Sequence, residues 1–152
     1  MQIDHPFIMK LVRTFKDSER VYYLTELVNG DDLFDALQNL NILNKEQSLF
    51  YFVSLLFVLE YLHNRSIIYR DLKPENVMID DTGYVKLIDM GTAKIVHDRT
   101  YTLLGTPVYT APEVIIGNGY AHFADYWSLS VCLYEFLCGC LPFGDENEED
   151  PF

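Results

Sequence analysis

The chain has 152 residues, of which 49 % are hydrophobic and 14 % aromatic, a composition that predicts one globular domain with a core and not a disordered chain. It carries 23 acidic against 11 basic residues, and the formal net charge of −12 argues against a nucleic-acid interface and against binding to an anionic membrane surface. The most apolar segment, residues 48–62, contains Glu60 and is shorter than the roughly 20 residues of a membrane-spanning helix, so no membrane span is expected.

The N-terminal part of the chain predicts two strands and a short helix. Residues 8–15 read as a strand, residues 16–19 as a turn and residues 21–25 as a second strand, because apolar runs flank a polar turn. Residues 29–31, with the sequence Asn-Gly-Asp, are expected to interrupt the regular secondary structure, and residues 32–39 are expected to form a short helix.

The remainder predicts a mainly helical part with a small hairpin. Residues 45–63 are apolar on nearly every face, which predicts a helix that is buried all round. Residues 77–79 and 85–87 flank an Asp-Asp-Thr-Gly turn, so we expect a hairpin that brings Asp89 to the site. Residues 123–137 predict another deeply buried helix. This order of elements predicts an α+β fold.

The cysteines, Cys132, Cys138 and Cys140, lie in one apolar stretch near the end of the chain. Their number is odd, and no histidine stands at a metal-ligand spacing from them. We therefore expect buried, reduced thiols and a cytoplasmic protein.

Residues 69–76, Tyr-Arg-Asp-Leu-Lys-Pro-Glu-Asn, place a carboxylate, an ammonium group and an amide on one short loop. Asp71 can accept a hydrogen bond from a substrate hydroxyl as catalytic base, and Lys73 can neutralise charge on a transferring phosphoryl group. Asn76 and Asp89 offer hard oxygen ligands of the kind that Mg²⁺ uses. The alternative that Asp71 and Asp89 are ordinary turn residues is weaker, because the motifs that follow agree with the spacing of this loop.

This loop, then Asp89-Met90-Gly91 and then residues 111–113, Ala-Pro-Glu, resemble the catalytic loop, the metal-binding Asp-Phe-Gly motif and the Ala-Pro-Glu motif of protein kinases, in the same order. The resemblance implies a partial kinase-like fold with ATP and Mg²⁺ as cofactors. Residues 1–28 would be the end of the small lobe and the hinge, and residues 29–152 the first part of the large lobe.

The resemblance also assigns the nucleotide site. Residues 25–28, Thr-Glu-Leu-Val, resemble the hinge that holds adenine, so Thr25, Glu26 and Val28, together with Met78, would bind the cofactor. The residues that match the hydrophobic spine of the family are Leu11, Tyr69 and Met90, with Met90 in place of the usual Phe.

Tyr69 before Arg-Asp, followed by Lys73, resembles the AGC group of serine/threonine kinases, and several segments look closest to cGMP-dependent protein kinases of protists. By this match Thr102 is an activation-loop phosphorylation site, whose phosphate would pair with Arg70 and Lys94. Thr106 would lie beside Asp71 and Lys73 and is assigned to the catalytic group; a turn Thr before Pro107 is the alternative.

Carboxylates on Asp32, Glu75 and Glu135 match positions that contact substrate arginines in cyclic-nucleotide-dependent kinases. They imply protein substrates with basic residues near the acceptor Ser or Thr, although each could instead be an ordinary surface charge. Asp125 matches the residue that holds the catalytic-loop backbone, and Glu113 matches one that pairs with a later Arg, which is absent here.

The sequence has no Gly-rich phosphate loop upstream of His5, no strand with the Val-Ala-x-Lys motif and no cyclic-nucleotide-binding domain. We expect an internal piece of a longer kinase, with little activity as an isolated chain and with cyclic nucleotide bound only through domains outside it. The alternatives are a catalytically inactive pseudokinase scaffold or interaction module and, more remotely, a metal-dependent hydrolase.

Overall fold

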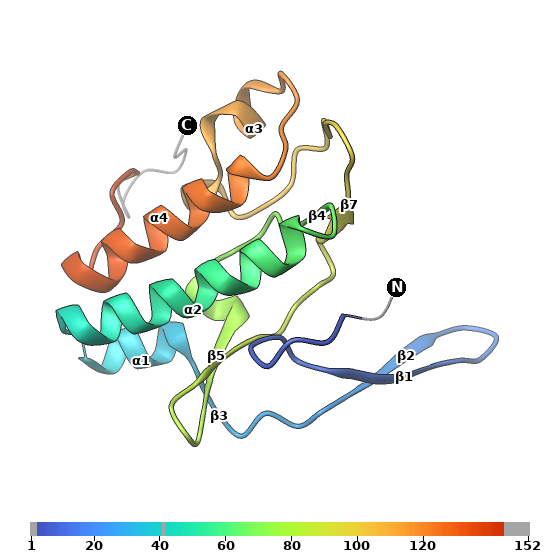
Figure 1. Ribbon diagram of the computed structural model, residues 1–152, viewed down its shortest axis with the longest axis horizontal. Helices are drawn as coiled ribbons and strands as arrows, with labels where there is room; N and C mark the ends of the chain where they lie inside the picture. The colour runs from blue at the N-terminus through green and yellow to red at the C-terminus, as the bar shows by residue number, and fades with distance from the viewer. Residues whose placement is uncertain (1–2, 41, 145–152) are drawn as a thin grey trace.

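The computed structural model describes residues 3–40 and 42–144, which form a helical body with a β-hairpin projecting from it (Figure 1). This mixture of small sheets and helices is the α+β arrangement that the sequence predicts. No helix of the described ranges is both long and apolar enough to cross a membrane.

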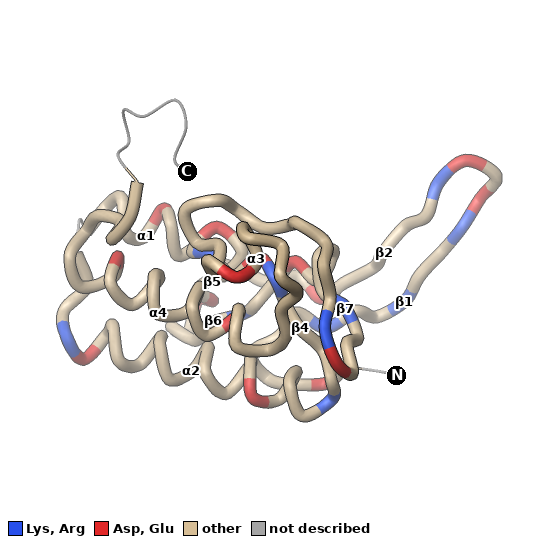
Figure 2. Tube along the Cα trace, turned by 90° about the horizontal axis from the view of Figure 1, so that it is seen from above, with Lys and Arg blue, Asp and Glu red and all other residues tan. Residues whose placement is uncertain are grey.

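The projecting hairpin consists of β1 (Leu11–Lys16) and β2 (Val21–Thr25), which pair antiparallel. The Asp17 side chain closes the turn by accepting hydrogen bonds from the backbone N–H groups of Glu19 and Arg20, at 2.8 and 2.7 Å. All of β1 is exposed, and acidic and basic residues share the tip (Figure 2).

The first strand was expected to begin at Ile8, and this start is wrong. Ile8 is buried in the body and makes an isolated parallel bridge with Leu87, outside any named strand. The backbone of Leu87 also donates to Phe7 O at 2.8 Å and accepts from Met9 N at 2.9 Å. The segment before β1 is therefore tied to the body, and the free hairpin starts only after it.

The central sheet has three short antiparallel strands in the order β3 (Gly30–Asp32), β5 (Val77–Asp80) and β6 (Val85–Leu87). The β5–β6 hairpin confirms the prediction for residues 77–87. Gly30 has φ +148°, and a Cβ there would overlap the carbonyl oxygen of Ile79, so only glycine fits this close approach of β3 to β5.

The main helices are α1 (Leu33–Leu40), α2 (Lys45–His63) and α4 (Phe123–Cys138), with α2 packed against α4 (Figure 1). The predicted bounds of α2 are confirmed, and Asn44 forms a capping box with Gln47 at its start. The core between the two long helices contains Leu55, Val58, Leu59 and Leu62 of α2 and Leu129, Val131, Cys132 and Phe136 of α4.

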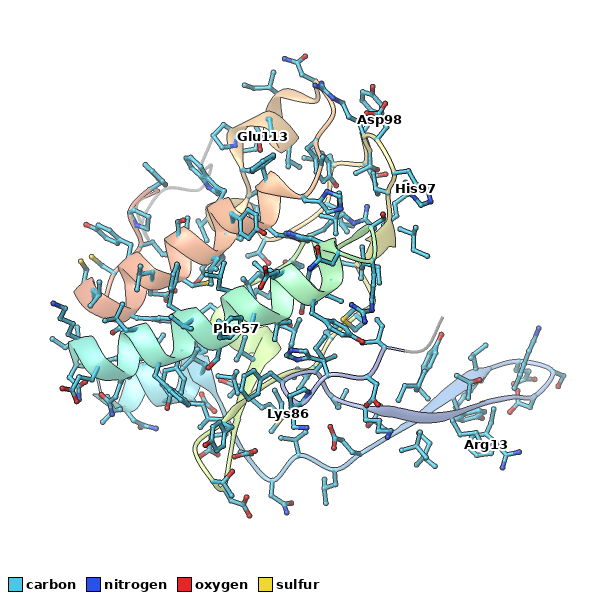
Figure 3. All side chains as sticks on the ribbon, in the orientation of Figure 1. Arg13, Phe57, Lys86, His97, Asp98 and Glu113 are labelled. Carbon is cyan, nitrogen blue, oxygen red and sulfur yellow. The ribbon has the colours of Figure 1, made fainter. Side chains whose placement is uncertain are left out.

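Helix α2 is not buried all round, which corrects the expectation from its sequence. Leu49, Phe50, Val53 and Phe57 are between 40 and 54 % exposed, and Phe57 is labelled in Figure 3. The helix packs on α4, β4 and β6, and none of these elements covers its outer stripe. The expected deep burial of the next long helix is also incomplete, because Phe123 is 79 % exposed.

Shorter elements complete the body. β4 (Ile67–Ile68) pairs with β7 (Lys94–Ile95), and α3 (Pro112–Ile116) ends at Gly117 in the left-handed conformation. Short 3₁₀ turns lie at Pro74–Asn76 and Pro107–Tyr109.

The cysteines differ from the expectation in their burial. All are free thiols, but only Cys132 is buried, whereas Cys138 and Cys140 are exposed. The difference follows from the end of α4, because Cys138 is its last residue and Gly139 turns the chain out of the helix.

Candidate active site

The candidate catalytic loop, residues 69–76, runs between β4 and β5 and is hydrogen-bonded to α4. The buried carboxylate of Asp125 accepts hydrogen bonds from Tyr69 N through Oδ2, at 2.9 Å, and from Arg70 N through Oδ1, at 2.8 Å. Arg70 has φ +76°, a left-handed conformation that a non-glycine residue rarely adopts, so these bonds hold a strained backbone. Asp125 thus contacts the loop backbone where the family resemblance places it.

A further residue, His63 at the end of α2, joins this arrangement. Its Nε2 lies 2.7 Å from Asp125 Oδ2, and its Nδ1 lies 3.1 Å from the hydroxyl of Tyr126. Sequence reasoning missed His63, because nothing in the local pattern connects a helix end with a residue 62 positions later.

Asp71 lies at the centre of the site, and two side chains bond its carboxylate. Thr106 donates from Oγ1 to Asp71 Oδ1 at 2.8 Å, although the two residues are 35 positions apart. Asn76 donates from Nδ2 to Asp71 Oδ2 at 3.2 Å and to the Asp71 carbonyl oxygen at 2.8 Å. Lys73 is half-buried on the same loop, and its carbonyl oxygen accepts from Asn76 N at 3.1 Å.

Asp89 follows β6 and is exposed beside this loop. Its Oδ1 accepts from Gly91 N at 2.7 Å, and the backbone N–H of the preceding residue, Ile88, donates to Asn76 O at 3.0 Å. Among the described residues, Asn76 Oδ1 and Asp89 Oδ2 therefore keep their lone pairs free of hydrogen bonds.

These two oxygens fit Mg²⁺, which takes one or two protein ligands and completes its octahedron with water and phosphate oxygens. In the part of the chain that the structure describes, no group of three or more His, Cys, Asp or Glu side chains could hold a metal alone. The donor set thus suits a metal that is shared with a phosphate ligand.

Tyr69 lies beneath these carboxylates and is fully buried, with no hydrogen-bond partner for its hydroxyl among the described residues. Burial raises the pKa of this phenol well above its usual range, and the charges of Asp89, Asp71 and Asp125 raise it further. Tyr69 is therefore a neutral packing residue under the site and not a titrating one.

The expected adenine-binding residues lie at the junction between the hairpin and the body. Thr25 ends β2 opposite Leu11, and Glu26 N donates to Lys10 O at 2.9 Å, so this N–H is not available to a ligand. Met78 lies on β5, directly opposite Lys86 of β6. Lys86 was missed by sequence reasoning, yet it contacts Glu26 directly, with Nζ 2.9 Å from Oε1.

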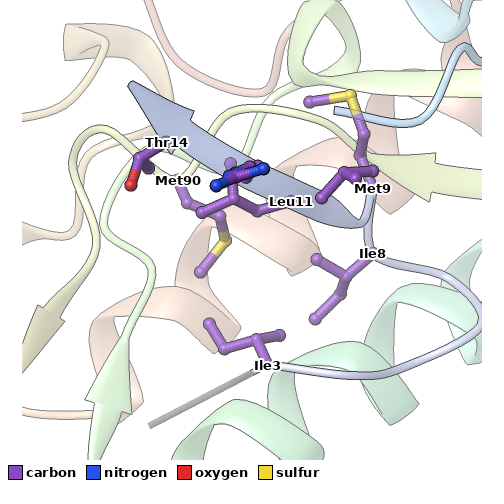
Figure 4. Close-up of a pocket in the computed structure, with 8 residues that line it drawn as sticks. Ile3, Ile8, Met9, Leu11, Thr14 and Met90 are labelled. Carbon is purple, nitrogen blue, oxygen red and sulfur yellow. The ribbon is translucent and has the colours of Figure 1, made fainter. Parts of the chain in front are cut away.

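The spine residues named from the sequence differ in their surroundings. Leu11 and Met90 both line an apolar cavity of about 590 Å³ at the base of the hairpin (Figure 4). Leu11 is 46 % exposed, whereas Tyr69 is completely buried. The remaining residues around the cavity are Ile3, Ile8, Met9, Val12, Arg13 and Thr14.

The expected phosphorylation site, Thr102, is exposed, and its carbonyl oxygen accepts from the Tyr120 hydroxyl at 2.8 Å. Arg70 donates from Nε to Thr92 O at 2.6 Å, while its Nη1 is buried without a partner among the described residues. Lys94 bonds Thr100 Oγ1 at 3.1 Å and not Thr102. Within the described residues, neither of these cations therefore bonds Thr102.

Two of the three expected substrate carboxylates come together. Tyr109 donates to Glu135 Oε2 at 2.7 Å, and burial, together with the nearby charge of Glu75, raises the pKa of Glu135 despite that bond. Glu75 Oε2 is buried with no partner in the described ranges. Asp32 instead caps α1 by accepting from Asp35 N at 2.8 Å.

Glu113 lies in the first turn of α3, half-buried, and no ion pair to it occurs within the described residues. The turn before it is pinned to α4, because Ser128 donates from Oγ to Tyr109 O at 2.8 Å. Thr110 also donates from Oγ1 to Thr106 O at 2.9 Å. These bonds hold Thr106 in reach of Asp71.

Comparison with known proteins agrees with this geometry. The family described as "Protein kinase domain" matches residues 1–152. The cGMP-dependent protein kinase of Plasmodium berghei (strain Anka) is 60 % identical over 146 residues, which are 96 % of this chain and 17 % of that protein. The corresponding protein of Toxoplasma gondii is 58 % identical over 146 residues, covering 96 % of this chain and 15 % of its own length.

A more distant relative is the cAMP-dependent protein kinase catalytic subunit PRKX of Mus musculus, 45 % identical over 146 residues, or 96 % of this chain and 41 % of that protein. The predicted resemblance to protist cGMP-dependent kinases is thereby confirmed, although the chain spans only a small share of those relatives. Since the family matches from the first residue to the last, and the relatives agree in kind, the chain belongs to the protein kinase family.

Proposed function

We propose that the protein containing this chain transfers the γ-phosphoryl group of ATP to Ser or Thr hydroxyl groups of protein substrates. The observation that carries this proposal is the Asp71 carboxylate, which Thr106 and Asn76 hold from two sides at 2.8 and 3.2 Å. A carboxylate fixed in this way can accept the proton of a substrate hydroxyl, and positioning of this kind supplies most of the catalysis in phosphoryl transfer.

The neighbouring residues have distinct roles in this proposal. The Lys73 ammonium group would stabilise negative charge on the transferring group. Asn76 Oδ1 and Asp89 Oδ2 would hold Mg²⁺, which supplies charge neutralisation to the phosphates when it is bound. Thr106 keeps Asp71 oriented through its hydroxyl, so that the base does not rotate away from the acceptor.

The nucleotide would bind where the hairpin joins the body. Because Glu26 N already donates to Lys10 O, adenine would be held by the remaining backbone groups of residues 25–28. Met78 would pack against the ring from β5. Thr25, which pairs with Leu11 across the hairpin, is small and would leave space next to the adenine.

Basic protein substrates are supported by the state of Glu75 and Glu135. A buried carboxylate oxygen without a partner is costly, and a substrate guanidinium group would satisfy Glu75 Oε2 and offset the charge repulsion with Glu135. Asp32 would take part only weakly, because its carboxylate already caps α1.

Regulation would act on the segment around Thr102. A phosphate on Thr102 would give Arg70 Nη1 the partner that it lacks and would draw Lys94 from Thr100. The similarity to cGMP-dependent kinases suggests control by cyclic nucleotide, bound by regions outside this chain, in a cytoplasmic protein.

The test uses the natural protein that contains this chain, assayed with Mg·ATP and an Arg-rich peptide with one Ser. Asp71→Asn keeps the shape of the side chain but removes the base, and we expect kcat to fall by about 10²–10⁴-fold with little change in the KM for ATP. Asp98→Asn, an exposed aspartate elsewhere, is the matched control. Equal activity of Asp71→Asn and the wild type would refute the proposal.

A further inference from the structure

The carboxylate of Glu26, just after β2, lies between two parts of the molecule. Its Oε1 accepts from Lys86 Nζ of β6 at 2.9 Å and from Lys10 N at 2.9 Å. The Glu26 backbone N–H in turn donates to Lys10 O at 2.9 Å. One side chain therefore ties both ends of the hairpin to the central sheet, close to the point where the register of β1 and β2 shifts.

Lys86 is held on the sheet face that would carry the nucleotide. It pairs directly with Met78 across β5 and β6, and Met78 pairs with Asp32 of β3. Residues directly opposite each other in antiparallel strands point to the same side of the sheet. The Lys86 side chain thus starts beside Met78 and reaches Glu26, and Figure 3 shows Lys86 on the side of the body from which the hairpin projects.

Among the described residues, Glu26 is the carboxylate that Lys86 bonds. Asp80, a second carboxylate near Lys86, forms no salt bridge with it, and its Oδ1 accepts from Thr82 N and Tyr84 N at 2.9 and 3.0 Å. The side chains of Lys86 and Glu26 are 19 and 33 % exposed, so water shields them only in part. The hydrogen bond from Lys86, followed by that from Lys10 N, lowers the pKa of Glu26, so this carboxylate is ionised near neutral pH.

We infer that the Glu26–Lys86 ion pair sets the separation between residues 25–28 and Met78, and so positions the two sides of the nucleotide site against each other. This inference rests on the proposed kinase function, and it assigns to Lys86 a role as a positioning residue for ATP. Other links across this junction are the bonds of Phe7 and Met9 to Leu87, before the hairpin, and the bond from Asp81 N to Asn29 O at 2.9 Å, after residues 25–28. Among the described residues, the side-chain link from residues 25–28 themselves to the sheet is the Glu26–Lys86 pair.

The inference predicts a selective effect on the nucleotide. Without the ammonium group, residues 25–28 lose one of their bonds to the sheet. Part of the binding free energy of ATP must then be used to hold these residues in place, so the affinity for ATP falls. A partly exposed ion pair contributes up to about 1 kcal/mol, which corresponds to about a fivefold change in an equilibrium constant. Lys86 does not contact Asp71 or Glu75 through any bond of the described residues, so the chemical step and peptide binding are not involved.

The test compares Lys86→Met, Lys86→Arg and the charge-swapped double variant Glu26→Lys/Lys86→Glu in the natural protein that contains this chain. We expect Lys86→Met to raise the KM for ATP about fivefold, while kcat and the KM for an Arg-rich peptide stay within about twofold. Lys86→Arg keeps the charge and should bind ATP as the wild type does, and the charge-swapped variant should recover part of the loss.

Lys45→Met, at an exposed position on α2, is the matched control and should change none of these constants. An unchanged KM for ATP in Lys86→Met, beside an active wild type, would overturn the inference alone. A parallel loss of Tm, kcat and both KM values would also overturn it, because it would indicate a general structural role. A wild-type protein that neither binds Mg·ATP nor phosphorylates the peptide would overturn the proposed function, and the inference with it.

Discussion

The candidate catalytic loop and the β1–β2 hairpin are held in opposite ways. The loop lies on the core, Asp125 and Thr106 bond it from other parts of the fold, and its own Asn76 bonds Asp71. The hairpin exposes apolar side chains along its length, such as Val12 at 58 % and Tyr23 at 69 %, and its backbone bonds to the rest of the described chain lie at its base. The difference shows that the fold fixes the positions of the candidate catalytic residues far more firmly than the position of the hairpin.

The largest effect is expected where the loop is held. Asp125→Ala removes the acceptor of Tyr69 N and Arg70 N and the partner of His63, and leaves these buried groups unpaired. We expect the free energy of unfolding of the chain to fall by about 3–5 kcal/mol, as measured by urea denaturation. Asp98→Ala, which removes an exposed carboxylate, is the control. A loss for Asp125→Ala as small as that of the control would show that the loop does not depend on α4.

A somewhat smaller effect is expected at the junction between the two regions. Gly30→Ala introduces a Cβ that overlaps Ile79 O and forces φ +148° on a residue with a side chain. Strain of this kind costs about 1–3 kcal/mol and should appear as a lower Tm of the chain. Gly83→Ala, also at positive φ but with open space around its Cβ, separates the overlap from the backbone strain. Equal losses at both glycines would mean that the contact with β5 does not matter.

A pH-dependent effect is expected beside the loop. The pKa of Glu135 is higher in the folded state than in the unfolded chain. Above the usual pKa range of a glutamate, the folded state therefore binds more protons at Glu135 than the unfolded chain does. Glu135 therefore destabilises the fold increasingly as the pH rises through its raised pKa. Glu135→Gln keeps an acceptor for Tyr109 and removes the charge. The free energy of unfolding of this variant minus that of the wild type should therefore rise with pH and then level off.

Unfolding free energies of both proteins between about pH 4 and pH 8 measure this difference. Glu60→Gln, at an exposed position of α2, should show no such trend. A constant difference between Glu135→Gln and the wild type across this range would contradict the assignment of the titration to Glu135.

The smallest effect is expected in the hairpin. Tyr23→Ser removes a side chain that is already 69 % exposed, and surface changes of this kind alter the free energy of unfolding by less than about 0.5 kcal/mol. Amide hydrogen exchange should likewise be fast in β2 and slow in α2, because local opening of the hairpin breaks few buried contacts. A loss above about 1 kcal/mol for Tyr23→Ser would show that the hairpin packs in solution, and the contrast with the loop would then fail.

The local parts of this molecule were predictable from the sequence alone. The bounds of α2 were predicted from a run of residues that is apolar on nearly every face, and the β5–β6 hairpin from short apolar runs on both sides of a polar turn, which are signals within one segment. The order of the motifs around Asp71 and Asp89 was sufficient to predict the kinase family, because these residues are close together in the chain.

Tertiary structure decided what depends on distant residues. The bonds of Lys86 to Glu26 and of His63 to Asp125 join positions 60 and 62 residues apart, and no local pattern encodes them. The bond of Thr106 to Asp71, 35 positions apart, was expected only through the family resemblance. Composition made α2 look buried all round and the cysteines look buried together, but burial depends on which neighbours cover a face. The sequence could not show that Asp32 caps a helix, because the role of a carboxylate depends on which hydrogen-bond donors the fold brings to it.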